Sequence, residues 1–272
     1  MPNADAWSDP SQASPEDVTR MAEHLEERSR RPDMQQVNQA VCAALRPLPG
    51  ERLLEVGCGT GILCRLVAPY LKKRGAITGL DISTQFLAFA RQQADPSTSD
   101  SQIQFANASG AAIPHADGCF DGAWGARLLL HVVDPDPIVH EMARVVRTGG
   151  RVVLADWDFE TATVDHPDRE LTRRILNWRT DYHGANNWSG RQLQRLEREA
   201  GLKDVQIHPL VVTASDERPA LTQSLWRAAE VARDGGAITE AEHEAWVSDL
   251  KERISSGRFF ASLVYFIVKG WK

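Results

Sequence analysis

Short apolar runs alternate along the chain with stretches whose apolar residues recur every three or four positions. Runs of this length are typical of strands, and the recurring pattern is typical of helices that bury one face. The pattern predicts strands at Leu53–Val56, Ala76–Asp81, Ile103–Ala106, Cys119–Trp124 and Arg151–Asp156, with helices between them at Ile62–Leu71, Thr84–Gln93 and Pro135–Val146. Strands that alternate with helices favour a parallel sheet with helices on both faces.

Two helices, Pro15–Arg30 and Asp33–Leu45, are predicted ahead of the first strand, after a loose tail rich in Pro, Ser and Asp. We expect them to form an N-terminal helical cap of about residues 15–46. The first of them is the better candidate for a lid over a ligand.

The second half is less regular. It predicts helices at Asp168–Tyr182, Ser189–Ala200, Pro219–Arg233 and Thr239–Ile254, and strands at Val205–Val212 and Phe259–Val268. The chain has no internal repeat and no convincing interdomain linker, so residues 1–272 are predicted to form one domain. Its parts are a core at about 50–157, further segments and inserts at about 158–258, and a last strand at 259–268.

Composition excludes several classes of function. The 272 residues are 42% hydrophobic and 25% charged, which is ordinary for a globular protein, and the net charge is -6. The basic cluster Arg28–Arg31 is short and reads as a solvated helix face, so we expect no nucleic-acid partner. No signal pattern or membrane span is evident, which favours the cytoplasm, and a homo-oligomer stays open. The four cysteines show no metal-ligand spacing, so no metal is expected.

A glycine-spaced turn follows the first predicted strand. Glu55 ends the apolar run, and Gly57, Gly59 and Gly61 follow at alternate positions. Glycine allows a tight turn and close approach of a ligand, and the next helix offers free N–H groups to it. A dinucleotide turn needs its third glycine where this chain has Ile62, so the turn alone indicates a nucleotide-like ligand of another kind.

Together with the turn, three more segments resemble the class I S-adenosylmethionine (SAM) methyltransferases of the small-molecule, ubiquinone/menaquinone type. They are Gly79–Ser83, Ile113–Asp121 and Arg144–Gly150, in the order and spacing of that family over roughly residues 50–157. The resemblance implies a Rossmann-like sheet of seven mostly parallel strands with an antiparallel last strand, and SAM as the cofactor. Gly149 and Gly150 are expected to cap the helix before the fifth strand.

The resemblance also implies a cofactor site. The methionine part of SAM would be surrounded by Glu55, Gly57, Gly59 and Gly61. Asp81 would hold the ribose and Ile82 would flank the adenine. Ser109 stands where the family has an adenine-contacting aspartate, so a serine hydroxyl, Asn107 or backbone N–H groups are the alternatives. Arg127 either pairs with the cofactor carboxylate or forms a surface ion pair.

Candidate catalytic and acceptor residues lie beyond the fourth strand. A hydroxyl acceptor would benefit from a general base, for which His131 is the first candidate and His183 with Tyr182 the second. Packing is the alternative for each of them. The acceptor pocket is predicted from Trp157, Trp178, Trp188 and Asn187, whereas Trp226 and Trp246 are assigned to the core.

The predicted function is therefore SAM-dependent methyl transfer to a small aromatic or heterocyclic metabolite. Two alternatives stay open. An NAD(P)-dependent oxidoreductase is compatible with Asp81, and a SAM-binding scaffold without catalysis is compatible with the departure at Ser109.

Overall fold

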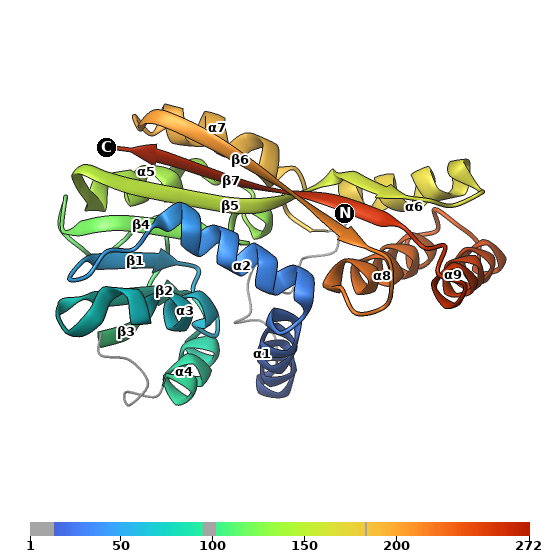
Figure 1. The fold of residues 1–272 in the computed structure, drawn as a ribbon, viewed down its shortest axis with the longest axis horizontal. Coiled ribbons are helices and arrows are strands. Elements are labelled where there is room, and N and C mark those ends of the chain that lie inside the picture. The colour runs from blue at the N-terminus through green and yellow to red at the C-terminus, as the bar shows by residue number, and fades with distance from the viewer. Residues whose placement is uncertain (1–13, 95–101, 183) are drawn as a thin grey trace.

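A seven-stranded sheet runs through the computed structural model, which describes residues 14–94, 102–182 and 184–272 (Figure 1). In the described residues the strand order is β3-β2-β1-β4-β5-β7-β6. The strands are β1 (Arg52–Val56), β2 (Ala76–Asp81), β3 (Gln102–Asn107), β4 (Phe120–Ala126), β5 (Val146–Val164), β6 (Lys203–Ala214) and β7 (Ala261–Trp271). Strands β1 to β5 pair in parallel, whereas β7 is antiparallel to both β5 and β6. The predicted fold class, with its antiparallel last strand, is confirmed.

Helices cover both faces of the sheet (Figure 1). They are α1 (Pro15–Ser29), α2 (Pro32–Leu45), α3 (Ile62–Leu71), α4 (Thr84–Gln93), α5 (Asp136–Val145), α6 (Arg169–Tyr182), α7 (Ser189–Glu199), α8 (Ala220–Asp234) and α9 (Glu240–Ser255). The core on one face contains residues of α2, α3 and α4, and the core on the other contains residues of α5 and α7. Helices α6, α8 and α9 gather at the far end of the long strands.

Strand β5 differs from its prediction at both ends. It was expected to span Arg151–Asp156, but it runs for 19 residues and keeps β7 as its partner as far as Val164. The expected helix cap at Thr148–Gly150 is wrong, because α5 ends at Val145 and Gly149 lies inside β5. Gly149 has a φ of +75° and donates its N–H to Lys272 O, at an irregularity in the pairing of β4 with β5. Its left-handed conformation therefore serves a bulge at the start of β5.

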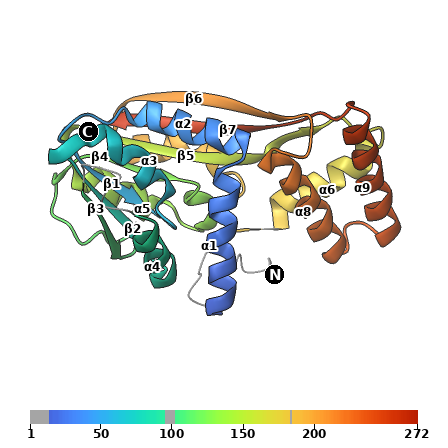
Figure 2. The same ribbon diagram turned by 60° about the horizontal axis from the view of Figure 1, so that its bottom comes forward.

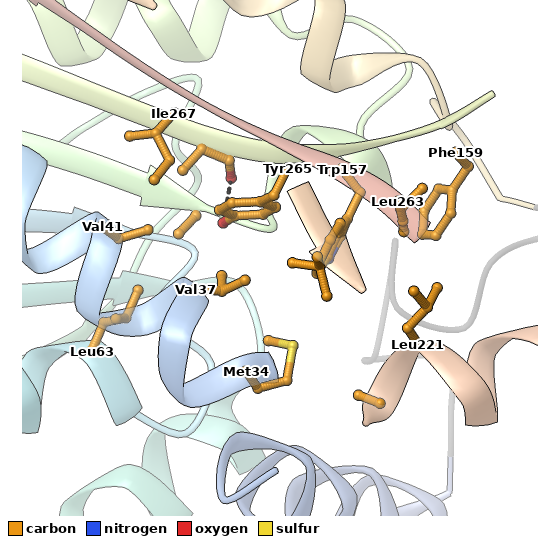
Figure 3. Packing of buried hydrophobic residues seen from close by; sticks show 14 of the residues in the cluster. Met34, Val37, Val41, Leu63, Trp157, Phe159, Leu221, Leu263, Tyr265 and Ile267 are labelled. Atoms are coloured by element: carbon orange, nitrogen blue, oxygen red, sulfur yellow. Dashed lines mark hydrogen bonds between the residues drawn. The ribbon is translucent and has the colours of Figure 1, made fainter. Parts of the chain in front are cut away.

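Alternate residues of β5 enter the two cores. Val152 and Leu154 face the core that holds α5 and α7, whereas Val153, Ala155 and Trp157 face the core that holds α2. Figure 3 shows the second core, in which Val37 and Val41 of α2 pack towards Tyr265 of β7. The Tyr265 hydroxyl donates to Ala155 O at 3.0 Å, so the one polar group of that side chain is satisfied inside the core.

Helix α1 stands apart from the sheet and lies between α4 and α8 (Figure 2). Ser14 caps it by accepting the N–H of Asp17. Val18 and Ala22 pack with Phe86 of α4, and Glu26 forms an ion pair with Arg65 of α3 at 2.7 Å. These contacts place one side of α1 over the carboxyl ends of the central strands.

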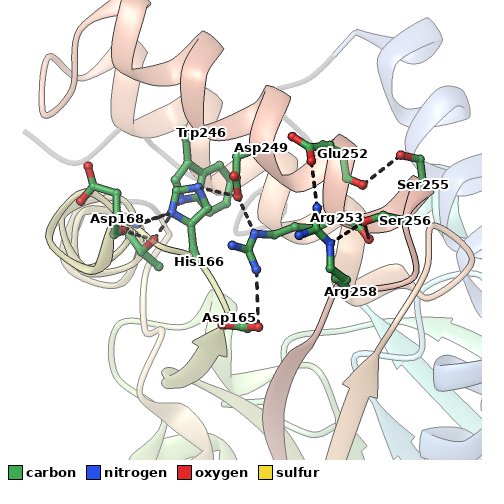
Figure 4. A network of polar contacts seen from close by, with 11 residues as sticks. Asp165, His166, Asp168, Trp246, Asp249, Glu252, Arg253, Ser255, Ser256 and Arg258 are labelled. Atoms are coloured by element: carbon green, nitrogen blue, oxygen red, sulfur yellow. Dashed lines mark hydrogen bonds and ion pairs between the residues drawn. The ribbon is translucent and has the colours of Figure 1, made fainter.

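A polar network joins α6 and α9 at the far end of the molecule (Figure 4). His166 Nε2 lies 3.3 Å from Asp249 Oδ2, and its ring stacks on Trp246. The Trp246 indole N–H donates to the Thr172 hydroxyl at 3.0 Å. Because Trp246 is fully buried, this hydrogen bond and the stacking position α9 against α6. Trp246 is therefore a core residue, as predicted.

Candidate active site

A cavity of about 1070 Å³ opens at the carboxyl ends of β1, β2, β4 and β5, the edge where open α/β sheets bind ligands. Helix α1 forms one wall, and residues of α6 and α8 form the opposite end. The lining is continuous from the glycine turn to these helices. The cavity therefore has room for two adjacent small ligands.

The glycine turn forms one end of this cavity. Gly57 and Gly59 have φ angles of +70° and +52° and line the space. A Cβ on Gly57 would lie 2.6 Å from Leu128 Cδ1, whereas a Cβ on Gly59 would meet only Leu25 Cδ1, at 3.7 Å. Gly61 does not line the cavity, because its side faces Phe105, whose Cζ would be 2.8 Å from an added Cβ. Gly59 thus faces open ligand space, Gly57 lines the cavity and is also required by its packing on Leu128, and Gly61 is required by packing alone.

Asp81 ends β2 beside the turn. Its Oδ2 accepts the Gly59 N–H at 2.8 Å and its Oδ1 accepts the Ser83 N–H at 2.8 Å. Burial raises the pKa of Asp81, and these backbone hydrogen bonds oppose the shift. Each carboxylate oxygen keeps a further lone pair for a ligand hydroxyl. Asp81 both fixes the turn and faces the cavity.

Glu55 lies deepest at this end and is 3% exposed. Burial raises the pKa of Glu55 to about 7, and the Cys64 thiol, which donates to Oε2 at 2.8 Å, opposes the shift. Arg127 also lowers the pKa of Glu55, although no ion pair joins the two within the described residues. A group that ionises near neutral pH can accept a hydrogen bond from a bound ammonium group or donate one.

The remaining predicted cofactor residues also line the cavity. Ile82 is 47% exposed and reaches it from the loop after β2. Ser109 lies on the loop after β3, where its hydroxyl accepts the Ala111 N–H. Arg127 follows β4 with a φ of +56° and donates its backbone N–H to Ala155 O at 2.8 Å. Its buried Nη1 has no hydrogen-bond partner among the described residues.

His131 lies near a buried carboxylate that sequence reasoning missed. It belongs to a short 3₁₀ turn, Leu129–His131, and lines the cavity. Asp156 is 1% exposed and accepts the N–H groups of Leu130 and Trp157. Burial raises the pKa of Asp156 to about 6, and His131 is the first of the groups that oppose the shift. An acidic residue at the end of the fifth predicted strand was the signal in the sequence.

Comparison with known proteins identifies the family. The family model described as "Methyltransferase domain" matches residues 54–154, which hold the glycine turn and Asp81. The chain is 30% identical to the O-methyltransferase rstn1 of Aspergillus nomiae over 163 residues, 60% of this chain and 69% of that protein. The chain belongs to the class I SAM-dependent methyltransferase family. This finding favours the methyltransferase interpretation over the NAD(P)-dependent oxidoreductase.

Two further matches describe the extent of this likeness. Methyltransferase GfsG of Streptomyces halstedii is 33% identical over 200 residues, 70% of this chain and 65% of that protein. The crystal structure of the YcgJ protein from Bacillus subtilis superposes with a TM-score of 0.58 at 18% identity, over 88% of this chain and 98% of that one. The chain spans 64%, 59% and 65% of the length of three curated relatives that it matches.

The rest of the cavity contains only part of the set predicted for the acceptor. Trp157 is 3% exposed and lines the cavity, and its indole N–H has no hydrogen-bond partner among the described residues. Asn187 lines it as well, while its amide donates to the carbonyls of Arg179 and Thr180 at the end of α6. Asn187 thus ties α6 to the cavity wall.

Of the predicted catalytic and acceptor residues, three lie outside the cavity and one lies outside the described residues. Trp178 packs against Gly235 and stacks on Tyr182 at 4.3 Å, and Tyr182 is 53% exposed. Trp188 is 44% exposed, with the Arg191 guanidinium 5.6 Å from its ring centre. His183 is the residue that the structure leaves undescribed. Helical spacing explains the difference, since Trp178 and Tyr182 share the face of α6 turned away from the cavity.

Sequence reasoning also missed residues that do line the cavity. Phe159 comes from the extended part of β5, and Arg179 comes from α6. Trp226, assigned to the core, faces the cavity from α8, and Arg28, taken for a solvated residue, faces it from α1. Whether these side chains face the cavity depends on tertiary packing, which the sequence pattern alone does not specify.

No described helix is long and apolar enough to cross a membrane. In the same described residues, no group of three His, Cys, Asp or Glu side chains is placed to hold a metal ion.

Proposed function

We propose that this protein transfers the methyl group of SAM to a small aromatic or heterocyclic acceptor. The observation that carries the proposal is the single continuous cavity, with a glycine turn and Asp81 at one end and His131, Trp157 and Phe159 further along it. Several relatives are named O-methyltransferases, which favours a hydroxyl oxygen as the methylated atom.

The residues at the turn fit SAM. Gly59 leaves open space where any side chain would project, and the Asp81 carboxylate suits a ribose diol because both its oxygens can accept hydrogen bonds. The buried, unpartnered Nη1 of Arg127 fits the cofactor carboxylate, with which it would form a charge-assisted hydrogen bond. Ile82 supplies an apolar surface for the adenine ring.

SAM, when bound, supplies the electrophilic methyl group and its own leaving group, so the chain mainly aligns the acceptor. His131, which lines the cavity, would remove the proton from an acceptor hydroxyl. Asp156, buried next to it, would stabilise the imidazolium that forms. Trp157 and Phe159 would hold the flat acceptor and exclude water from the reaction.

Calorimetry with S-adenosylhomocysteine (SAH) tests the cofactor part. We expect micromolar binding to the wild type and loss of at least tenfold in affinity for Asp81→Ala. A methyl-transfer assay with a panel of phenols and hydroxylated heterocycles tests the reaction, with SAH release as its readout. Absence of SAH binding contradicts the proposal, and SAH binding without transfer to any acceptor favours the scaffold alternative.

A further inference from the structure

Three arginine side chains of the cavity wall lack carboxylate partners. In the part of the chain that the structure describes, Arg28, Arg127 and Arg179 line the cavity, and none has a carboxylate oxygen within ion-pair distance. A buried charge without a counter-charge is costly, so such groups are rarely kept without a function.

The carboxylates that line the same cavity are already engaged elsewhere. Glu27 pairs with Arg31 and Glu230 pairs with Arg227, each at 3.1 Å. Asp81 accepts two backbone N–H groups, Glu55 accepts the Cys64 thiol, and Asp134 accepts the Asp136 N–H. Among the described residues, no carboxylate that lines the cavity therefore forms an ion pair with any of the three guanidinium groups.

Arg179 is held in place for a ligand. Its Nη1 donates to the Ser224 hydroxyl of α8 at 2.7 Å, and its guanidinium lies 3.8 Å above the centre of the Phe159 ring. Its buried Nε has no hydrogen-bond partner among the described residues. The side chain is thus fixed by one hydrogen bond and one ring, with a donor left over.

Arg28 interacts electrostatically with both of the other arginine residues. Burial lowers the pKa of Arg28 to about 10, and Arg127 contributes to the shift. Burial lowers the pKa of Arg179 to about 9, and the charge of Arg28 makes the next largest contribution to that lowering. Each group lowers its neighbour's pKa only if the charges are close, and an anion between them would relieve this repulsion.

The three groups divide between two ligands. Arg127 follows β4 and acts on Glu55, so it belongs to the cofactor end. Arg179 belongs to the acceptor end, beside Phe159. One cofactor carboxylate pairs with one guanidinium, which leaves two positive charges for the acceptor.

We propose that the acceptor carries an anionic group, a carboxylate or a phosphate monoester, bound by Arg28 and Arg179. This inference rests on the proposed function, because it concerns the second ligand of the same cavity. Arginine suits either anion, since its planar fork forms two parallel hydrogen bonds to a pair of oxygens. Selection of the acceptor would then depend on charge as well as on its aromatic ring.

Binding to the SAH-saturated protein tests the inference. The probes are 1-hydroxy-2-naphthoate, 1-naphthyl phosphate and the neutral 1-naphthol, each titrated by calorimetry. We expect at least one of the two anions to bind ten times more tightly than 1-naphthol, and the tighter one identifies the anion class. Equal affinities for all three probes, or dissociation constants for both anions weaker than about 1 mM, overturn the inference.

Variants test which residues bind the anionic group of the acceptor. Arg28→Gln and Arg179→Gln should each lower the affinity for the preferred anion about tenfold and leave 1-naphthol binding unchanged. Arg30→Gln and Arg173→Gln are matched controls, because both side chains are exposed and outside the cavity, and they should change neither affinity. An equal loss for anion and 1-naphthol in Arg179→Gln would mean that the residue only shapes the cavity.

SAH affinity separates this inference from the proposed function. If the wild type does not bind SAH, the proposed function fails whatever the naphthyl probes do. If SAH binds and the anion preference is absent, only the inference fails. A tenfold loss of SAH affinity in Arg28→Gln would assign Arg28 to the cofactor and overturn its role here.

Discussion

The Asp81 carboxylate accepts the backbone N–H of Gly59 at 2.8 Å and so joins the end of β2 to the glycine turn after β1. The second oxygen of the same carboxylate holds the Ser83 N–H at the start of α4. Two chain turns that surround the cavity therefore depend on one side chain. Loss of its charge should affect ligand binding even where the fold survives.

We predict that Asp81→Asn lowers SAH affinity at least tenfold. An amide has one acceptor oxygen, so it cannot serve both backbone N–H groups and two ribose hydroxyls. Calorimetry measures the change, and Asp181→Asn, an exposed position on α6, is the control. An affinity within twofold of the wild type would place the ribose elsewhere.

Alanine at Gly59 and at Gly61 should give different results. Both positions have positive φ, so each alanine costs about 1 kcal/mol of stability. At Gly61 the new Cβ also collides with Phe105, so Gly61→Ala should lose about 1–3 kcal/mol more in urea unfolding. At Gly59 the Cβ enters open cavity, so Gly59→Ala should lose SAH affinity instead. Equal losses of stability in the two variants would contradict this assignment.

Loss of a buried ion pair should lower the unfolding free energy more than loss of an exposed one. Glu51 and Arg151 are joined by two contacts of 2.7 Å and are about one-tenth exposed, and Arg151 also donates to carbonyls at the end of α2. Glu51→Gln leaves a buried guanidinium without its counter-charge and should cost about 3–5 kcal/mol of unfolding free energy. Glu199→Gln breaks an exposed pair with Arg195 and should cost less than about 1 kcal/mol. A similar loss in both variants would contradict the prediction.

Glu197 should make the fold less stable at high pH. It is fully buried on α7, and neither carboxyl oxygen has a hydrogen-bond partner among the described residues. Burial raises its pKa to about 9 from the ordinary 4.5. Between these two values the unfolded chain has released the proton while the folded chain retains it. Stability therefore falls as the pH rises from about 4.5 to about 9.

We predict that Glu197→Gln removes this dependence. The gain in unfolding free energy over the wild type should be small near pH 5 and reach about 1–3 kcal/mol near pH 8.5. Urea unfolding at the two pH values measures it, with Glu199→Gln on the same helix as the control. A gain that is the same at both pH values would mean that the carboxyl is not retained in its protonated form.

The ionisation of Asp156 should determine how the rate of methyl transfer falls at low pH. Because burial raises its pKa to about 6, the carboxylate that faces His131 becomes neutral as the pH falls through about 6. The rate of methyl transfer to a hydroxyl acceptor should decline over that range in the wild type. Asp156→Asn should lower the maximum rate about tenfold or more and move the acid limb away from pH 6, because the carboxyl that titrates there is absent. An unchanged pH profile in this variant would leave His131 to act without Asp156.

Much of the fold could be predicted from local pattern. The helix Ile62–Leu71 and the strand Ala76–Asp81 have the predicted bounds, because glycine residues and apolar runs mark both ends. Strand β5 was cut short at Asp156, since acidic and threonine residues after it look like a loop. Its pairing with β7, about 100 to 120 residues later in the chain, is a long-range effect that overrides local propensity.

The residues that line the cavity at the glycine turn could be predicted, and those at its opposite end only in part. Glu55, Gly57 and Asp81 are fixed by short motifs on adjacent strands, whose ends meet at one edge of the sheet. Trp178 and Arg179 are neighbours in sequence, yet only Arg179 faces the cavity. Which side of α6 turns inward depends on α8 and on the loop at Asn187, so no local signal distinguishes the two residues.

The length of β5 has a consequence for how this protein could acquire new acceptors. At about 3.3 Å per residue the strand is about 60 Å long. It carries Ala155, whose carbonyl accepts the backbone N–H of Arg127, and further along it Phe159, which lies near α6. Segments 165–188 and 215–258 could therefore be exchanged for those of a relative while β5 and β7 stay in place. Such chimeras would inherit an intact cofactor end together with a foreign acceptor wall, which makes the helices at the far end of the strands natural units of recombination.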